Sequence, residues 1–161
     1  MLPEGKDSVI NHPQPEDNNM SHHHIIAAFV LAAAIAAPIA FGDEDTHVKG
    51  PDPAHISMGQ EVNVADYLVP GKTTIVDFYS EYCPPCRAIA PKLAKLHASR
   101  DDIAVVKVDI NRPGVRGIDW GSPVAHQYKL HSIPHFNIYG PDGKLQAEGD
   151  AAYDKVLKLV E

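Results

Sequence analysis

Two apolar runs on either side of a helical pattern constrain the fold of this chain more than any other feature. The run from Thr73 to Tyr79 is rich in β-branched and aromatic residues, and Ile103 to Asp109 is almost continuously apolar. Both patterns are typical of buried parallel strands. Between them, Ile89, Leu93 and Leu96 recur at helical spacing. This order of strand, helix and strand predicts a βαβ unit.

The rest of the chain continues this alternation. A short helix is predicted from Ser122, which can cap it, to Tyr128. The runs His135–Tyr139 and Lys144–Ala147 flank Gly-Pro-Asp-Gly, which indicates a hairpin, and Asp150 can cap a final helix. We therefore expect an α/β domain over residues 54–161, with a central mixed β-sheet flanked by helices on both faces.

Composition and charge narrow the classes of partner. A chain of 161 residues holds one domain of ordinary size and an added segment. A net charge of −7 provides no basic surface for neutralising phosphates. We therefore expect no nucleic-acid partner and no attraction to anionic membrane surfaces.

The N-terminal region carries a targeting pattern. Residues 1–19 hold three prolines, four acidic residues and one lysine, which predicts a disordered extension. Residues 25–42 then run for eighteen positions without a charge, and Ala40-Phe41-Gly42 has the small-x-small pattern of a cleavage site. We interpret residues 20–42 as a signal peptide or an uncleaved membrane anchor, and residues 43–53 as a linker.

The acidic start does not suit a secretory signal, which begins with basic residues. Our hypothesis is that translation starts at Met20, so that residues 1–19 are not made. Three consecutive histidines, residues 22–24, then belong to the leader and not to a metal site of the mature protein. The signal predicts a periplasmic or otherwise extracytoplasmic protein that contacts the membrane only through its N-terminal segment.

The chain has two cysteines, Cys83 and Cys86, at the predicted start of the first helix. A disulfide closing so short a loop contributes about 2 kcal/mol at most, which favours a redox use over a structural one. The free N–H groups and the dipole of a helix N-terminus lower the pKa of a thiol there. This predicts Cys83 as the exposed attacking thiol and Cys86 as the more buried resolving thiol.

Four blocks, in order, resemble thioredoxins. They are Val76 to Arg87 with Cys83-Pro84-Pro85-Cys86, then Ile89-Ala90-Pro91, Lys107 to Asn111, and Ser132-Ile133-Pro134. The similarity extends over about Val62 to Glu161. With the lead-in from Gly59 to Leu68, the chain is similar to exported bacterial thiol–disulfide oxidoreductases. The resemblance implies a thioredoxin-like fold, a Cys83-Cys86 redox disulfide, no cofactor, and protein thiols or disulfides as substrates.

The resemblance also implies roles for residues around the cysteines. Asp77 becomes the proton acceptor for Cys86, with Lys107 as its charge partner. The alternative is that Asp77 marks the exit of a strand at the surface. Burial of an unpaired carboxylate is costly. The first role therefore requires a partner for a buried Asp77, whereas a carboxylate at the surface requires none.

Substrate contacts are implied for Tyr82, Pro84, Ile133 and Pro134. Tyr82 stands where the family usually has Trp. A cis peptide is expected before Pro134, in a loop that binds substrate backbone like an added strand. The two intervening prolines differ from the usual Gly-Pro and remove two N–H groups near the Cys83 sulfur, which favours a reducing direction.

Several alternatives stay open on the sequence. The loop from Arg112 to Ser122 is longer than in ordinary thioredoxins, and its Trp120 either packs the loop or contacts partners. A metal-binding or partner-binding module without redox turnover is the other function, with Cys83, Cys86 and His135 as three ligands for zinc or copper. A reductant outside the cytoplasm implies a membrane electron donor of the DsbD or CcdA type, and a monomer is expected.

Overall fold

The structure is a computed structural model that describes residues 48–161. The expected extension, the start at Met20, the signal peptide or anchor and the first residues of the linker lie outside the described residues. The described residues lie within one compact unit. Between residues 48 and 161, no helix has the length and apolar character needed to cross a membrane.

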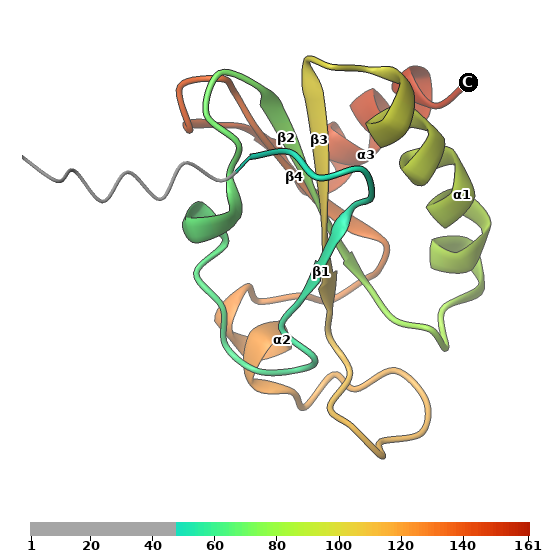
Figure 1. Cartoon of the computed structure of the whole chain (residues 1–161). Coiled ribbons are helices and arrows are strands. Elements are labelled where there is room, and N and C mark those ends of the chain that lie inside the picture. Colours follow the sequence, from blue (N-terminus) through green and yellow to red (C-terminus); the bar gives the residue numbers. More distant parts are fainter. Residues whose placement is uncertain (1–47) are drawn as a thin grey trace, which may run out of the picture. The chain divides into compact units, whose positions relative to one another are not determined.

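A five-stranded mixed sheet forms the centre of the domain (Figure 1). Its strands follow the order β1-β3-β2-β4-β5, with β1 and β2 parallel to β3, and with β4 antiparallel to both β2 and β5. Their bounds are β1 Ala54–Ile56, β2 Thr73–Tyr79, β3 Ile103–Asp109, β4 His135–Tyr139 and β5 Leu145–Glu148. The predicted mixed sheet is confirmed, and β2, β3 and β4 have the predicted bounds.

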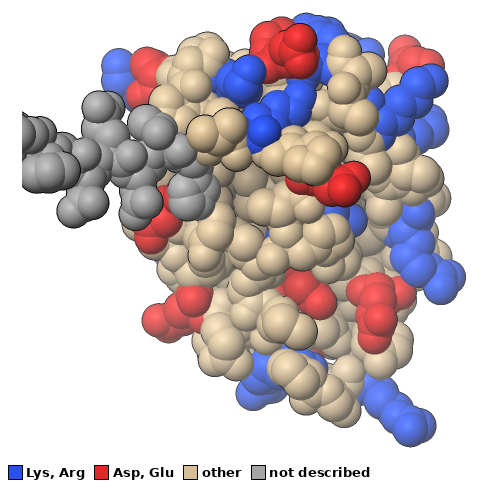
Figure 2. All heavy atoms as spheres, in the orientation of Figure 1, with Lys and Arg blue, Asp and Glu red and all other residues tan. Residues whose placement is uncertain are grey.

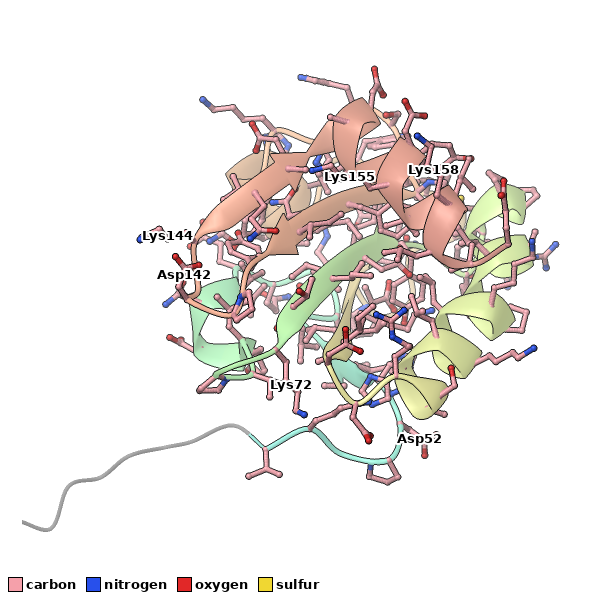
Figure 3. All side chains as sticks on the ribbon, turned by 90° about the horizontal axis from the view of Figure 1, so that it is seen from above. Asp52, Lys72, Asp142, Lys144, Lys155 and Lys158 are labelled. Carbon is pink, nitrogen blue, oxygen red and sulfur yellow. A yellow bond between two sulfur atoms is a disulfide. The ribbon has the colours of Figure 1, made fainter. Side chains whose placement is uncertain are left out.

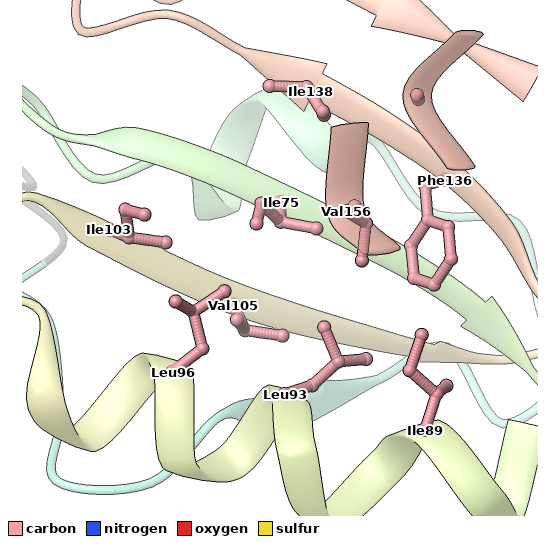
Figure 4. Close-up of a cluster of buried hydrophobic side chains, with 10 residues drawn as sticks. Ile75, Ile89, Leu93, Leu96, Ile103, Val105, Phe136, Ile138 and Val156 are labelled. Carbon is pink, nitrogen blue, oxygen red and sulfur yellow. The ribbon is translucent and has the colours of Figure 1, made fainter. Parts of the chain in front are cut away.

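The predicted βαβ unit is present, with α1 (Pro84–Ser99) connecting β2 to β3. Ile89, Leu93 and Leu96 of α1 pack onto the sheet, as their spacing predicted. Figure 4 shows these side chains facing those of β2 and β3. The last helix, α3 (Gly149–Leu159), buries Ala152 and Val156 in the same cluster. Together α1 and α3 cover one face of the sheet.

The opposite face is covered by α2 (Pro123–Gln127) and a 3-10 helix, Val64–Tyr67. The apolar side chains buried there include Val76, Phe78, Val108, Ile110 and Val124. Val76 and Phe78 on β2 and Val108 on β3 alternate with the residues that face α1, as the period of two in a strand requires. Helices therefore lie on both faces, as predicted.

The predicted N-cap residues can be checked at the starts of α2 and α3. Ser122 caps α2, and its hydroxyl accepts a hydrogen bond from the N–H of Ala125 at 3.3 Å. The prediction for Asp150 is wrong, because α3 begins at Gly149 and its N-cap is Glu148, two residues before Asp150. Asp150 lies inside the first turn, where its charge still complements the positive end of the helix dipole. Lys155 and Lys158 project from the outer surface of α3 (Figure 3).

Part of the segment interpreted as a linker contacts the domain. Lys49 donates a hydrogen bond to the carbonyl of Arg100 at 2.6 Å. The carbonyl of Gly50 lies 2.9 Å from Nε2 of the buried His97 on α1. These contacts place residues 49 and 50 against the C-terminal part of α1.

Candidate active site

Cys83 and Cys86 form a disulfide at the N-terminus of α1. Cys83 is the N-cap residue, and its Sγ accepts a hydrogen bond from the N–H of Cys86 at 3.2 Å. Pro84 and Pro85 occupy the first turn, where their missing N–H groups interrupt no helical hydrogen bond. The N–H of Cys83 donates to the carbonyl of Ser80 at 3.1 Å, which fixes the turn between β2 and α1.

The predicted difference in burial between the two cysteines is wrong. Cys83 and Cys86 are each 1% exposed. Cys83 is covered because its Sγ lies 3.6 Å from the carbonyl oxygen of Ile133, in the loop before β4. In the disulfide form, the order of attack therefore rests on position in the helix and not on exposure.

The loop that covers Cys83 has a cis peptide between Ile133 and Pro134, in agreement with the sequence prediction. A groove of about 260 Å³ runs between Pro134, Pro85 and the apolar side chains of α1 and α3, including Tyr153 and Leu157. Tyr82, directly before Cys83, is 42% exposed. Apolar surface on Tyr82, Pro85 and Pro134 thus lies beside the disulfide, where a polypeptide can contact it.

Asp77 is buried in the middle of the sheet. Its exposed fraction is 0%, so the alternative that it marks a strand exit at the surface is excluded. It lies two residues after Ile75 on β2, so its side chain points to the same face, which α1 covers. Neither carboxylate oxygen has a hydrogen-bond partner. Burial raises the pKa of Asp77 from 3.8 to about 7, against an opposing effect of Lys107.

Lys107 is the cation nearest to this carboxylate. The two residues pair across β2 and β3, and Lys107 Nζ lies 3.7 Å from Asp77 Oδ2, close enough for an ion pair and too long for a hydrogen bond. Its ammonium also lies 4.1 Å from the centre of the Tyr79 ring, which is a cation–π contact. The structure brings Asp77 and Lys107 together as the resemblance implied.

Tyr79 and His55 complete this cluster and were not singled out by the sequence analysis. The Tyr79 hydroxyl lies 3.1 Å from Nδ1 of His55 on β1. Burial, with Asp109 second, raises the pKa of Tyr79 to about 12, so the phenol stays neutral. Burial and then Lys107 lower the pKa of His55. A strand as short as β1 has no periodicity that could have revealed this contact.

The residues considered as metal ligands are arranged differently. Cys83 and Cys86 are bonded to each other. The ring of His135 packs edge-on against Phe78, with centroids 5.7 Å apart. In the described part of the chain, no three side chains of His, Cys, Asp or Glu lie close enough together to hold a metal ion.

Comparison with known proteins shows to which family this chain belongs. The thioredoxin family model matches residues 60–160, which include the disulfide, Asp77, Lys107 and the cis peptide. The chain belongs to the thioredoxin family. Its α/β architecture is accordingly the thioredoxin fold.

Individual thioredoxins are similar over part of this chain. Thioredoxin-T of Drosophila melanogaster is 32% identical over 95 residues, covering 58% of this chain and 55% of its own. The chain thus spans about half the length of that relative. Thioredoxin of Chlamydia trachomatis is 30% identical over 107 residues, covering 65% of this chain and 95% of its own. Thioredoxin of Streptomyces clavuligerus is 37% identical over 75 residues, covering 47% and 63%.

Solved thioredoxin structures can also be aligned. Spinach chloroplast thioredoxin f, in its short form, has a TM-score of 0.48 and 23% identity, covering 70% of this chain and 94% of its own. Thioredoxin f2 of Chlamydomonas reinhardtii has a TM-score of 0.48 and 26% identity, covering 67% and 93%.

Proposed function

We propose that this thioredoxin is an exported thiol–disulfide oxidoreductase that reduces disulfides of protein substrates. The observation that carries the proposal is the Cys83–Cys86 disulfide at the start of α1, with Cys83 Sγ 3.6 Å from the Ile133 carbonyl beside a cis-Pro. A reversible disulfide next to apolar surface and a cis-Pro loop suits exchange with an extended polypeptide.

The reaction follows from the positions of the thiols. In the reduced protein, the Cys83 thiolate attacks one sulfur of a substrate disulfide, forms a mixed disulfide and releases the other substrate sulfur as a thiolate. Cys86 then gives its proton to the Asp77 carboxylate and attacks Cys83 Sγ. The second substrate thiolate leaves, and the Cys83–Cys86 disulfide forms. Two electrons pass from the protein to the substrate.

Asp77 is suited to take this proton. Its carboxylate oxygens are free of hydrogen bonds, and its pKa of about 7 lets it exchange a proton near neutral pH. Lys107, at 3.7 Å, limits the rise of that pKa. We propose Lys107 as the residue that keeps Asp77 able to ionise.

The order of attack can be tested by trapping. Cys86→Ser is expected to accumulate mixed disulfides with substrate proteins, because Cys83 can still attack and nothing resolves the product. Cys83→Ser is the matched control and should accumulate none. Non-reducing gels and mass spectrometry of the captured complexes measure this. Trapping by Cys83→Ser alone would reverse the assignment, and trapping by neither variant would refute exchange with proteins.

We infer the reducing direction from the hydrogen-bond donors around Cys83. Pro84 and Pro85 have no N–H, and among residues 48–161 the amide of Cys86 is the backbone donor to this sulfur. A thiolate with few donors is stabilised moderately, so the reduction potential is expected nearer to about −270 mV than to about −120 mV. Equilibration with glutathione measures it, and a value above about −150 mV would contradict the proposed direction.

Export is proposed from the apolar run of residues 25–42 and the small-x-small pattern that ends at Gly42. An exported reductant receives electrons across the membrane, so we propose a donor of the DsbD or CcdA type. Cell fractionation with mass spectrometry of the mature N-terminus tests export. A peptide that spans residues 19 and 20 would contradict translation from Met20, and a purely cytoplasmic protein would contradict export.

A further inference from the structure

A second pocket lies next to the cis-Pro loop and is not used by the mechanism above. It has a volume of about 620 Å³ and is lined by Trp120, Ala125, His126, Lys129, Leu130 and His131. Ala125 and Leu130 are buried and form apolar lining, while Trp120 is 41% exposed. The pocket combines an apolar base with a lysine and two imidazoles.

One wall of this pocket belongs to the loop from Arg112 to Ser122, which contributes Trp120. Arg112 closes the loop through two hydrogen bonds to the carboxylate of Asp119, at 2.7 and 2.9 Å. The side chain of Asn111 donates to the carbonyl of Gly117 at 2.6 Å. Trp120, next to the buried Asp119, is therefore held by an ordered loop, and its exposure does not come from a loose segment.

Lys129 occupies a backbone position where glycine is usual. It follows α2 with a φ of 50°, and the N–H of Leu130 donates to the carbonyl of Ala125 at 2.9 Å, as in a left-handed helix end. A residue with a Cβ is less stable than glycine in this conformation. The side chain of Lys129 is exposed at the pocket, so the chain carries a cation there at some cost to the backbone.

The pocket continues the surface that faces the disulfide. His131 precedes Ile133 by two residues, and a chain advances at most about 3.6 Å per residue, so their backbones are within about 7 Å. The Ile133 carbonyl is itself 3.6 Å from Cys83 Sγ. A substrate strand lying along this loop would therefore reach the pocket with the side chain two or three residues from its reactive cysteine.

Lys129 can attract a carboxylate only at short range, because the protein as a whole is acidic. Figure 2 shows basic and acidic side chains interspersed over the face in view, with uncharged areas between them, and the whole chain carries a net charge of −7. An acidic protein does not attract acidic substrates through its overall field. A single lysine beside two potential hydrogen-bond donors can still select a carboxylate at short range.

We propose that this pocket binds an acidic side chain of the substrate protein, two or three residues from the cysteine that Cys83 attacks, and so selects substrates. The inference rests on the proposed reduction of protein disulfides. Lys129 contacts the carboxylate, and Trp120 packs on the aliphatic part of the same side chain.

The test uses the full chain, reduced beforehand and freed of reductant, with short peptides that each contain one internal disulfide. The peptides differ only by Glu, Gln or Lys, two or three residues before or after one cysteine. The second-order rate constant for oxidation of the protein is measured by rapid alkylation and mass spectrometry. Glu is expected to react about threefold faster than Gln at low salt, with the preference lost in high salt.

Three variants identify the pocket as the source of the preference. Lys129→Glu should reverse the order so that the Lys peptide reacts fastest. Lys129→Gly should abolish the preference while the melting temperature stays equal or rises, since glycine suits a φ of 50°. Lys155→Glu, on the outer surface of α3, makes the same change in net charge and should leave the preference intact.

The outcomes separate this inference from the proposed function. If no peptide oxidises the protein, the reductase proposal fails. If all peptides oxidise it at equal rates and Lys129→Glu changes nothing, the reductase proposal stands and the pocket inference is overturned. A preference that Lys155→Glu also reverses would assign the selection to overall charge and would equally overturn the pocket inference.

Discussion

At the scale of single residues, Asp77 makes the stability of the protein depend on pH. The native state keeps this proton up to about pH 7, whereas the carboxyl has an ordinary pKa of 3.8. Between these values the native state binds more protons than the unfolded chain, so its stability falls as the pH rises. A shift of this size corresponds to a loss on the order of 4 kcal/mol.

Asp77→Asn should remove this dependence. We expect similar free energies of unfolding for wild type and variant at pH 3.5, below the ordinary pKa of the carboxyl, and a more stable variant at pH 8.5, because the buried charge never forms. Denaturant unfolding of the oxidised protein at both pH values measures the difference. Lys107→Met is the complementary change and should extend the decline of stability to higher pH and make it larger, since the cation that favours ionised Asp77 in the native state is gone. Parallel pH curves for all three proteins would contradict the assignment.

The cluster around Asp77 also shows the limit of prediction from single residues. Asp77 and Lys107 could be paired from the sequence because they lie in matching blocks on two strands with a clear apolar pattern. Tyr79 and His55 could not, since their contact depends on where the three-residue β1 pairs beside β3. The equal burial of Cys83 and Cys86 depends on the loop at Ile133, which comes from a distant part of the chain.

At the scale of elements, Gly59 lies where the loop that follows β1 contacts the loop that follows β3. Its N–H donates to the carbonyl of Asp109 at 2.8 Å, and its φ is +80°. A Cβ at this position would lie 2.6 Å from the backbone nitrogen of Arg112. This close approach gives a physical reason for the glycine that opens the lead-in from Gly59 to Leu68.

Gly59→Ala is expected to lower the free energy of unfolding by about 2–4 kcal/mol, because the positive φ and the backbone clash both oppose it. Gly114→Ala is the matched control, with a φ of +82° and no atom within 4 Å of the added Cβ. It should cost only about 1–2 kcal/mol. Urea unfolding of the two variants compares these costs, and an equal loss in both would show that the clash relaxes.

At the scale of the whole molecule, the architecture was predictable because its central strands and first helix carry strong patterns. Three patterns each specify one part of the structure. The apolar runs specify β2 and β3, the spacing of Ile89, Leu93 and Leu96 specifies α1, and the Gly-Pro-Asp-Gly turn specifies the hairpin of β4 and β5. The start of α3 was misplaced by two residues because Asp150 suits both a cap and a first turn. The contacts of residues 49 and 50 with α1 had no local signal.

The contacts of residues 49 and 50 predict that the folded unit extends to the segment before β1. The buried His97 accepts a hydrogen bond at Nδ1 from the N–H of Val105 at 2.9 Å, so a neutral ring carries its proton on Nε2 and donates to the Gly50 carbonyl. Lys49 adds its hydrogen bond to Arg100 at the end of α1. The segment before β1 therefore stabilises α1 and the edge of the sheet where β1 pairs with β3.

A fragment of residues 48–161 should consequently be more stable than one of residues 54–161, by about 1–2 kcal/mol for the hydrogen bonds lost. Urea unfolding of the two fragments measures the difference. His97→Ala, introduced into both, completes a double-mutant cycle, and the difference between the fragments should shrink because the acceptor at residue 50 then has no partner to lose. Fragments of equal stability would mean that residues 48–53 only connect the domain to what precedes it, whereas a difference that survives His97→Ala would assign the stabilisation to Lys49.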